Sequence, residues 1–165
     1  KYEYNAKDFG LEYYSPTFGK DYTGSGVWTE TAFLSQNDFL KAELRYLPFA
    51  QRKDKKIIDA KIKQYEEESK ESVDNFVELI KVLQKGHYYI GCEFGTDRTS
   101  AYLLLNEVFN PKAENKSDKK LKDYAGLYEM DYMYELYKKL TPEHKQDLGW
   151  TENFDKKVRE KLLDR

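Results

Sequence analysis

A chain of 165 residues with 39% hydrophobic and 35% charged residues is long enough to form one globular domain with its own core. Its formal net charge of -2 gives no overall attraction to nucleic acid, and no stretch has the roughly 18 apolar residues of a transmembrane span. The single cysteine, Cys92, excludes an intramolecular disulfide, and with only two histidines a zinc site is not expected. We therefore expect no metal and no cofactor. A lone thiol is compatible with the cytoplasm, or with export after removal of a signal peptide.

The first third of the chain contains two predicted strands. Residues 1–26 are rich in Tyr, Gly and Ser, and we expect them to be largely irregular. The β-leaning stretch 27–34 and the alternating stretch 42–49 ("AELRYLPF") are the predicted strands. A charged loop is expected over residues 50–56.

Most of the remaining chain is predicted to be helical. The spacing of apolar residues predicts helices over 57–69, 73–85, 99–109, 121–140 and 153–163. Ser72 is expected to cap the second of these helices and Gly86 to stop it. Thr141 and Pro142 predict the start of a further short helix, with His144 exposed to solvent in its first turn.

A short β run over residues 87–91 precedes the predicted helix at 99–109. Strands that alternate with helices predict an α/β fold with a central, mostly parallel sheet flanked by helices. We expect a single domain over residues 1–165, with a helical C-terminal part over 112–165. Ligand sites in such sheets lie at the carboxyl ends of the strands, and Cys92 follows such an end.

The loop from Cys92 to Arg98 combines features of a phosphate site. The helix that begins near Thr99 presents unpaired backbone N–H groups to the loop. Arg98 carries a planar set of donors that matches two phosphate oxygens, and Gly95 allows a close approach of the backbone. A thiol in this setting is shifted toward the thiolate, which would attack phosphorus and form a phosphocysteine. The Thr99 hydroxyl is placed to assist the departure of the sulfur.

The stretch Tyr88–Ser100, "YYIGCEFGTDRTS", resembles the signature loop of the cysteine-based protein tyrosine phosphatase superfamily. The ending Asp97–Arg98–Thr99 is most similar to the bacterial, lipid-directed and myotubularin-like branches. The resemblance is strongest over residues 87–109 and extends more weakly back to Phe33. It implies that Cys92 is the nucleophile and Arg98 the phosphate clamp. It also implies a cradle of backbone N–H groups from Glu93, Phe94, Gly95, Thr96, Asp97 and Arg98.

The resemblance further implies a general acid, usually an aspartate on a loop upstream of the cysteine. Asp54, which follows the predicted strand at 42–49, is the first candidate, and Asp59 is the next. Asp97 is the third candidate, because an aspartate at that loop position has this role in myotubularin-like phosphatases.

The predicted function is hydrolysis of phosphomonoesters, with phosphotyrosine peptides as the favoured substrates. Phosphoinositides or inositol phosphates are the alternative substrates: the basic residues around Asp54 would bind their additional phosphates, whereas Glu93 would repel them. A phospho-ligand binding module without turnover is a further alternative. It is favoured by Gly91, where the family usually has histidine, and by the negative charge of Glu93 beside the thiol. A helical interaction protein with a buried cysteine is the last alternative.

Overall fold

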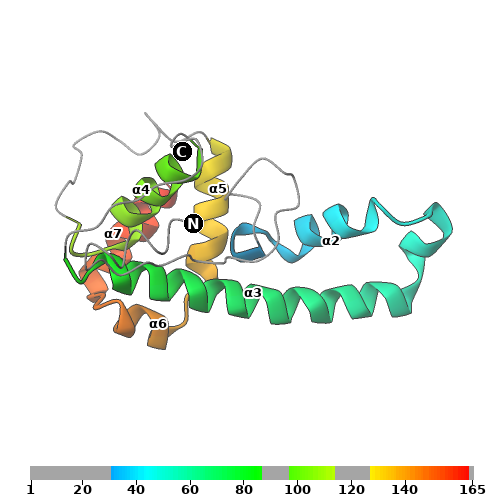
Figure 1. Cartoon of the computed structure of the whole chain (residues 1–165), viewed down its shortest axis with the longest axis horizontal. Helices are drawn as coiled ribbons and strands as arrows, with labels where there is room; N and C mark the ends of the chain where they lie inside the picture. The colour runs from blue at the N-terminus through cyan, green and yellow to red at the C-terminus, as the bar shows by residue number, and fades with distance from the viewer. Residues whose placement is uncertain (1–30, 87–96, 114–126, 164–165) are drawn as a thin grey trace, which may run out of the picture.

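The computed structural model describes residues 31–86, 97–113 and 127–163, and every regular element in these ranges is a helix (Figure 1). In chain order these elements are η2 (Thr31–Phe33), α2 (Gln36–Leu44), η3 (Phe49–Lys53), α3 (Lys55–Leu83), α4 (Asp97–Phe109), α5 (Leu127–Lys139), α6 (Pro142–Asp147) and α7 (Glu152–Leu163). The prediction of an α/β fold with a central, mostly parallel sheet is therefore wrong, since the described ranges contain no strand.

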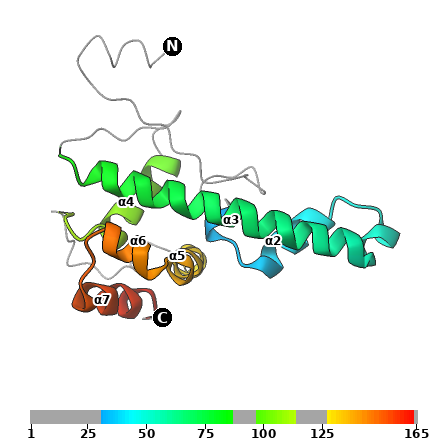
Figure 2. The same cartoon turned by 90° about the horizontal axis from the view of Figure 1, so that it is seen from below.

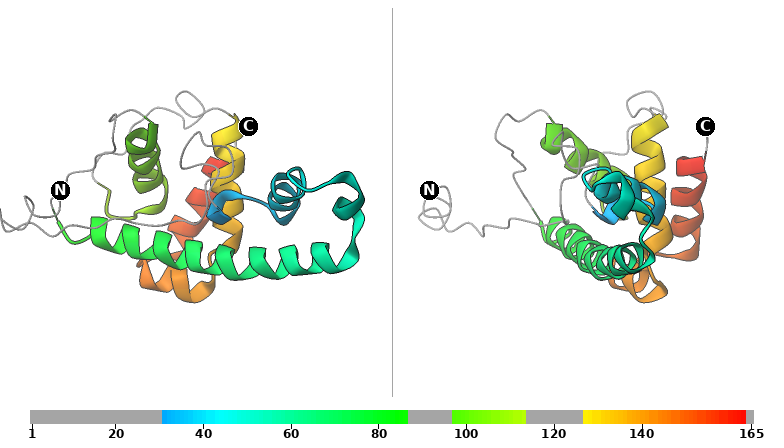
Figure 3. Two further views of the ribbon diagram at one scale, coloured as in Figure 1. Left: turned by 45° about the vertical axis from the view of Figure 1, so that its right-hand side comes forward. Right: turned by 90° about the vertical axis from the view of Figure 1, so that its right-hand side faces the viewer.

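The helices form a body and an arm. The 29-residue helix α3 is about 43 Å long at 1.5 Å per residue, and it runs through both parts (Figures 1 and 2). Helices α4, α5, α6 and α7 gather around its C-terminal half and form the body. Helix α2 and η3 lie along its N-terminal half and form the arm, which projects beyond the body (Figure 3).

The hydrophobic core lies mainly in the body, where it joins the C-terminal half of α3 to α4, α5 and α7, and Phe39 of α2 extends it to the base of the arm. Its largest fully buried side chains are Phe33, Phe39, Phe76, Phe109, Ile80, Leu105, Met130, Met133, Leu136 and Leu148. Phe76 of α3 meets Phe109 of α4 edge to face, with ring centroids 5.2 Å apart. Trp150 stacks on Phe109 with ring centroids 6.1 Å apart, and its indole N–H donates to the Phe109 carbonyl at 3.0 Å. These contacts fix the position of α4 against α3.

The stretch predicted as a strand at 42–49 begins inside helix α2 instead. Ser35 caps this helix, because its hydroxyl accepts the backbone N–H of Asp38 at 3.2 Å. Phe39 and Glu43, four residues apart, are the buried residues of α2, and Glu43 forms an ion pair with Lys61 of α3. The residues before Arg45 favour helix formation, and this preference together with the cap outweighs the short alternation that suggested a strand.

The two helices predicted at 57–69 and 73–85 form one continuous helix. Ser72 does not cap a helix; its buried hydroxyl accepts the backbone N–H of Ala32 at 2.8 Å. No glycine or proline interrupts α3, so its backbone continues through this serine. The helix ends at Leu83, two residues before the predicted end, and Gly86 follows with a positive φ of 149°.

The helices predicted at 99–109 and 153–163 are confirmed as α4 and α7, and the short helix after Thr141 is confirmed as α6. Helix α5 lies inside the stretch predicted at 121–140, whose first six residues are outside the described ranges. The segments predicted at 1–26 and 87–91 are also outside them. Among the described helices, none is both long enough and apolar enough to cross a membrane.

Candidate functional site

The predicted phosphate loop is only partly described by the structure. Cys92, Glu93, Phe94, Gly95 and Thr96 lie outside the described residues. Helix α4 begins at Asp97, so the backbone of Arg98 and Thr99 belongs to its first turn. The helix that the sequence predicted immediately after the motif is therefore present.

Helix α4 is held by its buried side. Ala101, Leu105 and Val108 are almost completely buried and pack with Phe109 in the core. At the C-terminal end, the Asn110 amide donates to Asn106 Oδ1 at 2.8 Å, and both asparagines are buried. A helix of 13 residues is only marginally stable on its own, so packing against the core holds α4 in place. This packing also sets the position of its first turn.

Asp54, the first general-acid candidate, caps α3. Its carboxylate accepts the backbone N–H groups of Lys56 at 2.8 Å and of Ile57 at 3.4 Å. This places Asp54 at the end of the arm, whereas α4 lies beside the opposite half of α3 (Figures 1 and 3). Asp59, one turn further along α3, belongs to the same end. The structure does not bring either aspartate together with the first turn of α4.

The basic residues around Asp54 also lie on the arm. The Arg52 guanidinium donates to the backbone carbonyls of Leu47 at 2.8 Å and of Arg45 at 2.9 Å, so it holds the turn between α2 and η3. The Lys53 ammonium lies 5.3 Å from the ring centroid of Phe49. These cations are therefore at the far end of α3 from Arg98.

His144 was predicted to be solvent-exposed, and this prediction is wrong. Its side chain is 19% exposed, and its Nε2 lies 2.9 Å from Asp74 Oδ1 on α3. Because His144 Nδ1 accepts the backbone N–H of Thr141 at 3.3 Å, Nε2 is the nitrogen that donates to Asp74. The histidine thus completes the cap of α6 and ties α6 to α3 across 70 residues of sequence.

Lys139, at the end of α5, is a polar residue that the sequence analysis did not single out. Its ammonium donates to the backbone carbonyls of Thr31 at 2.8 Å, Ala32 at 3.1 Å and Leu34 at 2.7 Å. The ammonium also lies 5.0 Å from the ring centroid of Tyr65. Burial lowers the pKa of Lys139 to about 8. The partners of the ammonium are backbone oxygens and an aromatic ring. Lys139 therefore has a structural role, because it joins η2 to α5.

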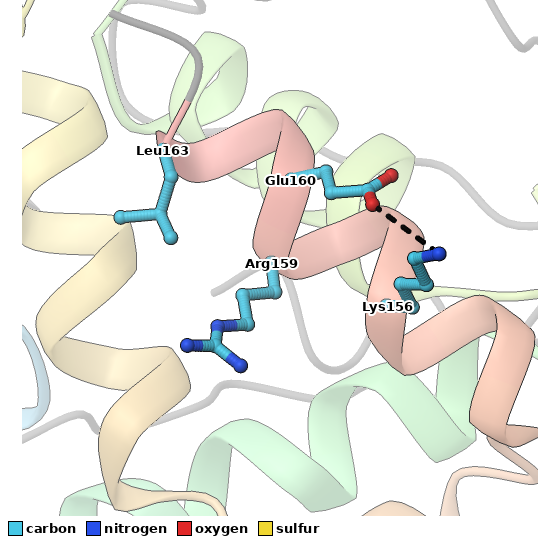
Figure 4. A pocket seen from close by; sticks show the side chains of 4 residues that line it. All are labelled: Lys156, Arg159, Glu160 and Leu163. Carbon is cyan, nitrogen blue, oxygen red and sulfur yellow. Dashed lines mark ion pairs between the residues drawn. The ribbon is translucent and has the colours of Figure 1, made fainter.

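A shallow hollow lies beside α7 (Figure 4). It is lined by Lys156, Arg159, Glu160 and Leu163. Lys156 and Glu160 already form an ion pair at 3.8 Å, and the lining contains no nucleophile. Across the described ranges, no group of three or more His, Cys, Asp or Glu residues could hold a metal ion. The hollow therefore lacks the side chains that would make it an alternative to the α4 site.

The structure separates residues that the sequence had assigned to one site. Asp97, Arg98 and Thr99 are together at the start of α4, while Asp54 and its basic neighbours are at the end of the arm. Comparisons with known proteins give no match, since no family model, no curated protein and no solved structure is similar to this chain.

Proposed function

We propose that this protein is a cysteine-dependent phosphomonoesterase, with Cys92 as the nucleophile and Arg98 as the phosphate clamp. The observation that carries the proposal is the position of Arg98 and Thr99 in the first turn of α4, directly after the Cys-x5-Arg-Thr motif. The first N–H groups of a helix have no partner within the helix, and the helix dipole adds positive potential there. A phosphate dianion is attracted to such a terminus, and an arginine in the first turn strengthens that attraction.

The chemistry has two steps. The Cys92 thiolate attacks phosphorus, a sulfur–phosphorus bond forms, and the ester oxygen leaves with a proton from a general acid. Water then attacks the phosphocysteine and returns a proton to the acid group, the sulfur leaves as thiolate, and inorganic phosphate is released. No electron is transferred and no metal is needed, because the helix terminus and Arg98 carry the charge of the phosphoryl group.

Phosphotyrosine peptides remain the proposed substrates, with inositol phosphates and phosphoinositides second. An inositol polyphosphate would need basic residues near the reacting phosphate to bind its additional phosphates. The basic residues from Arg52 to Lys56 lie at the far end of α3, so they do not add phosphate-binding groups beside α4. Glu93 follows the thiol directly, and its charge disfavours a substrate with adjacent phosphates.

The helical fold supports a second candidate function, a helical interaction protein without turnover. In the superfamily that the motif resembles, a sheet holds the cysteine loop, and the described residues of this chain contain no strand. The projecting arm of α2 and α3 offers a surface outside the body to which a partner could bind (Figure 1).

A phosphatase assay on the whole chain separates these candidates. We expect hydrolysis of para-nitrophenyl phosphate that is inhibited by vanadate, because vanadate occupies a thiolate and arginine cradle as an oxyanion. Vanadate binding without turnover would instead identify a phospho-ligand binding module. A protein that shows no turnover and binds no vanadate would contradict the proposal. The helical interaction protein would then be the remaining candidate.

The proposed general acid is Asp97, because it precedes Arg98 at the start of α4 while Asp54 caps α3 at the far end. We expect Asp97→Asn to reduce the rate roughly 10²–10⁴-fold on phenyl phosphate, whose leaving group needs a proton, and much less on a nitrophenyl ester. Asp54→Asn is the matched control: asparagine caps helices as well as aspartate does, so both rates and the fold should be unchanged. Steady-state kinetics on both esters test this, and the reverse pattern would assign the acid to Asp54.

A further inference from the structure

The end of the arm carries the two most exposed large hydrophobic side chains of the described residues. We call residues 45–56, which connect α2 to the start of α3, the arm tip. Tyr46 is 71% exposed and Phe49 is 72% exposed. Two exposed aromatic side chains only three residues apart on a projecting turn are unusual for a surface that faces only water.

The same short segment is strongly basic. It contains five basic residues and one acidic residue, a net charge of +4 on a chain whose total is -2. The basic residues are Arg45, Arg52, Lys53, Lys55 and Lys56, and all five are exposed. The one acidic residue, Asp54, directs its carboxylate to the backbone N–H groups at the start of α3. The arm tip therefore presents positive potential together with apolar surface.

The cations and the aromatic rings of the arm tip are interleaved. The Arg45 guanidinium lies 4.7 Å from the ring centroid of Tyr46 and donates to its hydroxyl at 2.6 Å. Lys53 lies 5.3 Å from the ring centroid of Phe49, and Arg52 holds the backbone of the turn through two carbonyls. The tip is thus ordered by its own contacts before it meets any partner, which reduces the entropy lost on binding.

We infer that the arm tip binds the surface of an anionic phospholipid bilayer. Tyr46 and Phe49 would lie at the boundary between headgroups and acyl chains, where aromatic side chains are favoured. The basic residues would contact lipid phosphates and carboxylates, each strengthening binding roughly fivefold. Buried apolar area and electrostatic attraction to anionic lipids together set the strength of such peripheral binding.

The shape of the arm tip favours a bilayer over an acidic protein as the partner. The tip is a narrow turn at the end of a projecting pair of helices, so it is convex (Figures 1 and 3). A fluid bilayer surface adapts to a convex protrusion, whereas a protein would need a matching cavity. This inference is independent of the proposed enzyme activity, because the arm tip and the start of α4 lie at different ends of α3.

Vesicle co-sedimentation with the whole chain tests the inference. We expect binding to phosphatidylcholine vesicles that contain about 30% phosphatidylserine, no binding to phosphatidylcholine alone, and weakening with added salt. The triple variant Lys53→Gln, Lys55→Gln, Lys56→Gln should bind about 100-fold more weakly. Its matched control removes three exposed charges from α7, at Lys156, Lys157 and Arg159, and should bind like the wild type.

The contribution of the two aromatic side chains to vesicle binding is tested separately. The double variant Tyr46→Ser, Phe49→Ser should lose at least about tenfold in affinity for the anionic vesicles, while the control Leu163→Ser, on α7, should not. Phe49→Trp should show a blue shift of tryptophan emission on vesicle addition that the wild type lacks. Circular dichroism confirms that each variant is folded. The inference would be overturned if the protein did not bind vesicles, or if it bound neutral and anionic vesicles equally. It would also be overturned if the α7 controls lost as much vesicle affinity as the arm-tip variants.

Discussion

Cys92→Ser will reduce the hydrolysis of para-nitrophenyl phosphate by at least about 10⁴-fold while the protein still binds vanadate or phosphate. Serine keeps the size of the side chain, but its hydroxyl is not ionised near neutral pH and cannot act as the nucleophile without a base. In the proposed site, the donors that bind the oxyanion are the N–H groups at the start of α4 and Arg98, and the substitution leaves both in place. Single-turnover kinetics and vanadate titration by calorimetry measure the two effects.

Arg98→Lys will lose both turnover and oxyanion affinity, because an ammonium cannot make the two parallel hydrogen bonds of a guanidinium. The matched control is Arg159→Lys on α7, which makes the same chemical change on an exposed helix away from α4 and should have no effect. Full activity in Cys92→Ser would refute the nucleophile assignment, and unchanged vanadate affinity in Arg98→Lys would refute the clamp.

Lys139→Met will lower the free energy of unfolding by about 2–4 kcal/mol at neutral pH. Three backbone carbonyls of the η2 segment lose a charged donor, and each such hydrogen bond contributes about 1.5–3 kcal/mol before the cost of burying the ammonium is subtracted. For a chain of this length the melting temperature should fall by roughly 5–15 °C. The matched control is Lys138→Met: that lysine is exposed and pairs with Glu135, so its loss should cost less than about 1 kcal/mol.

The pH dependence of stability provides an independent readout for Lys139. Its pKa is lowered by burial to about 8 in the folded protein, whereas an unfolded lysine keeps its proton up to about 10.4. Between these values the unfolded chain binds more protons, so stability rises with pH, by at most about 1.4 kcal/mol per pH unit. Below about pH 8 both states are protonated and this contribution is constant.

Charged groups around Lys139 set the useful range of that experiment. Glu135 raises the lysine pKa and Lys138 lowers it, each by less than the burial does. Tyr65 faces the ammonium, and burial raises its pKa above 10. Ionisation of Tyr65 therefore lowers the free energy of unfolding as pH rises, but only above about pH 10. Urea denaturation from about pH 7.5 to 9.5 isolates the lysine. A wild-type slope that persists in Lys139→Met would show that another group causes it.

Local sequence signals predicted the helices of the body well. The apolar spacing of 99–109 and 153–163 and the cap at Thr141 gave α4, α7 and α6, because each helix buries one face and its ends follow local capping rules. The same kind of signal is present for α2, at Ser35 and Asp38, whereas the alternation at 42–49 favours a strand.

Other features depend on contacts that no local pattern contains. Ser72 looks like a helix cap in the sequence, and only the approach of Ala32 from 40 residues away shows that its hydroxyl is used elsewhere. Lys139 reaches carbonyls more than 100 residues earlier in the chain, and His144 reaches Asp74. A lysine at the end of a helix and a histidine in a first turn are ordinary surface residues until the tertiary packing is known.

The continuity of α3 has a consequence for the order in which the chain folds. The first turn of a helix is costly to form, whereas each later residue adds a hydrogen bond at little cost. Because Phe76 and Ile80 are buried in the core, we expect the C-terminal half of α3 to nucleate the helix and the N-terminal half to grow from it. Helix α2 docks on the extended half through local contacts, such as Glu43 with Lys61, only 18 residues apart. We therefore expect the arm to need no folding nucleus of its own, because its contacts with α3 are local and the half of α3 that carries it continues from the body.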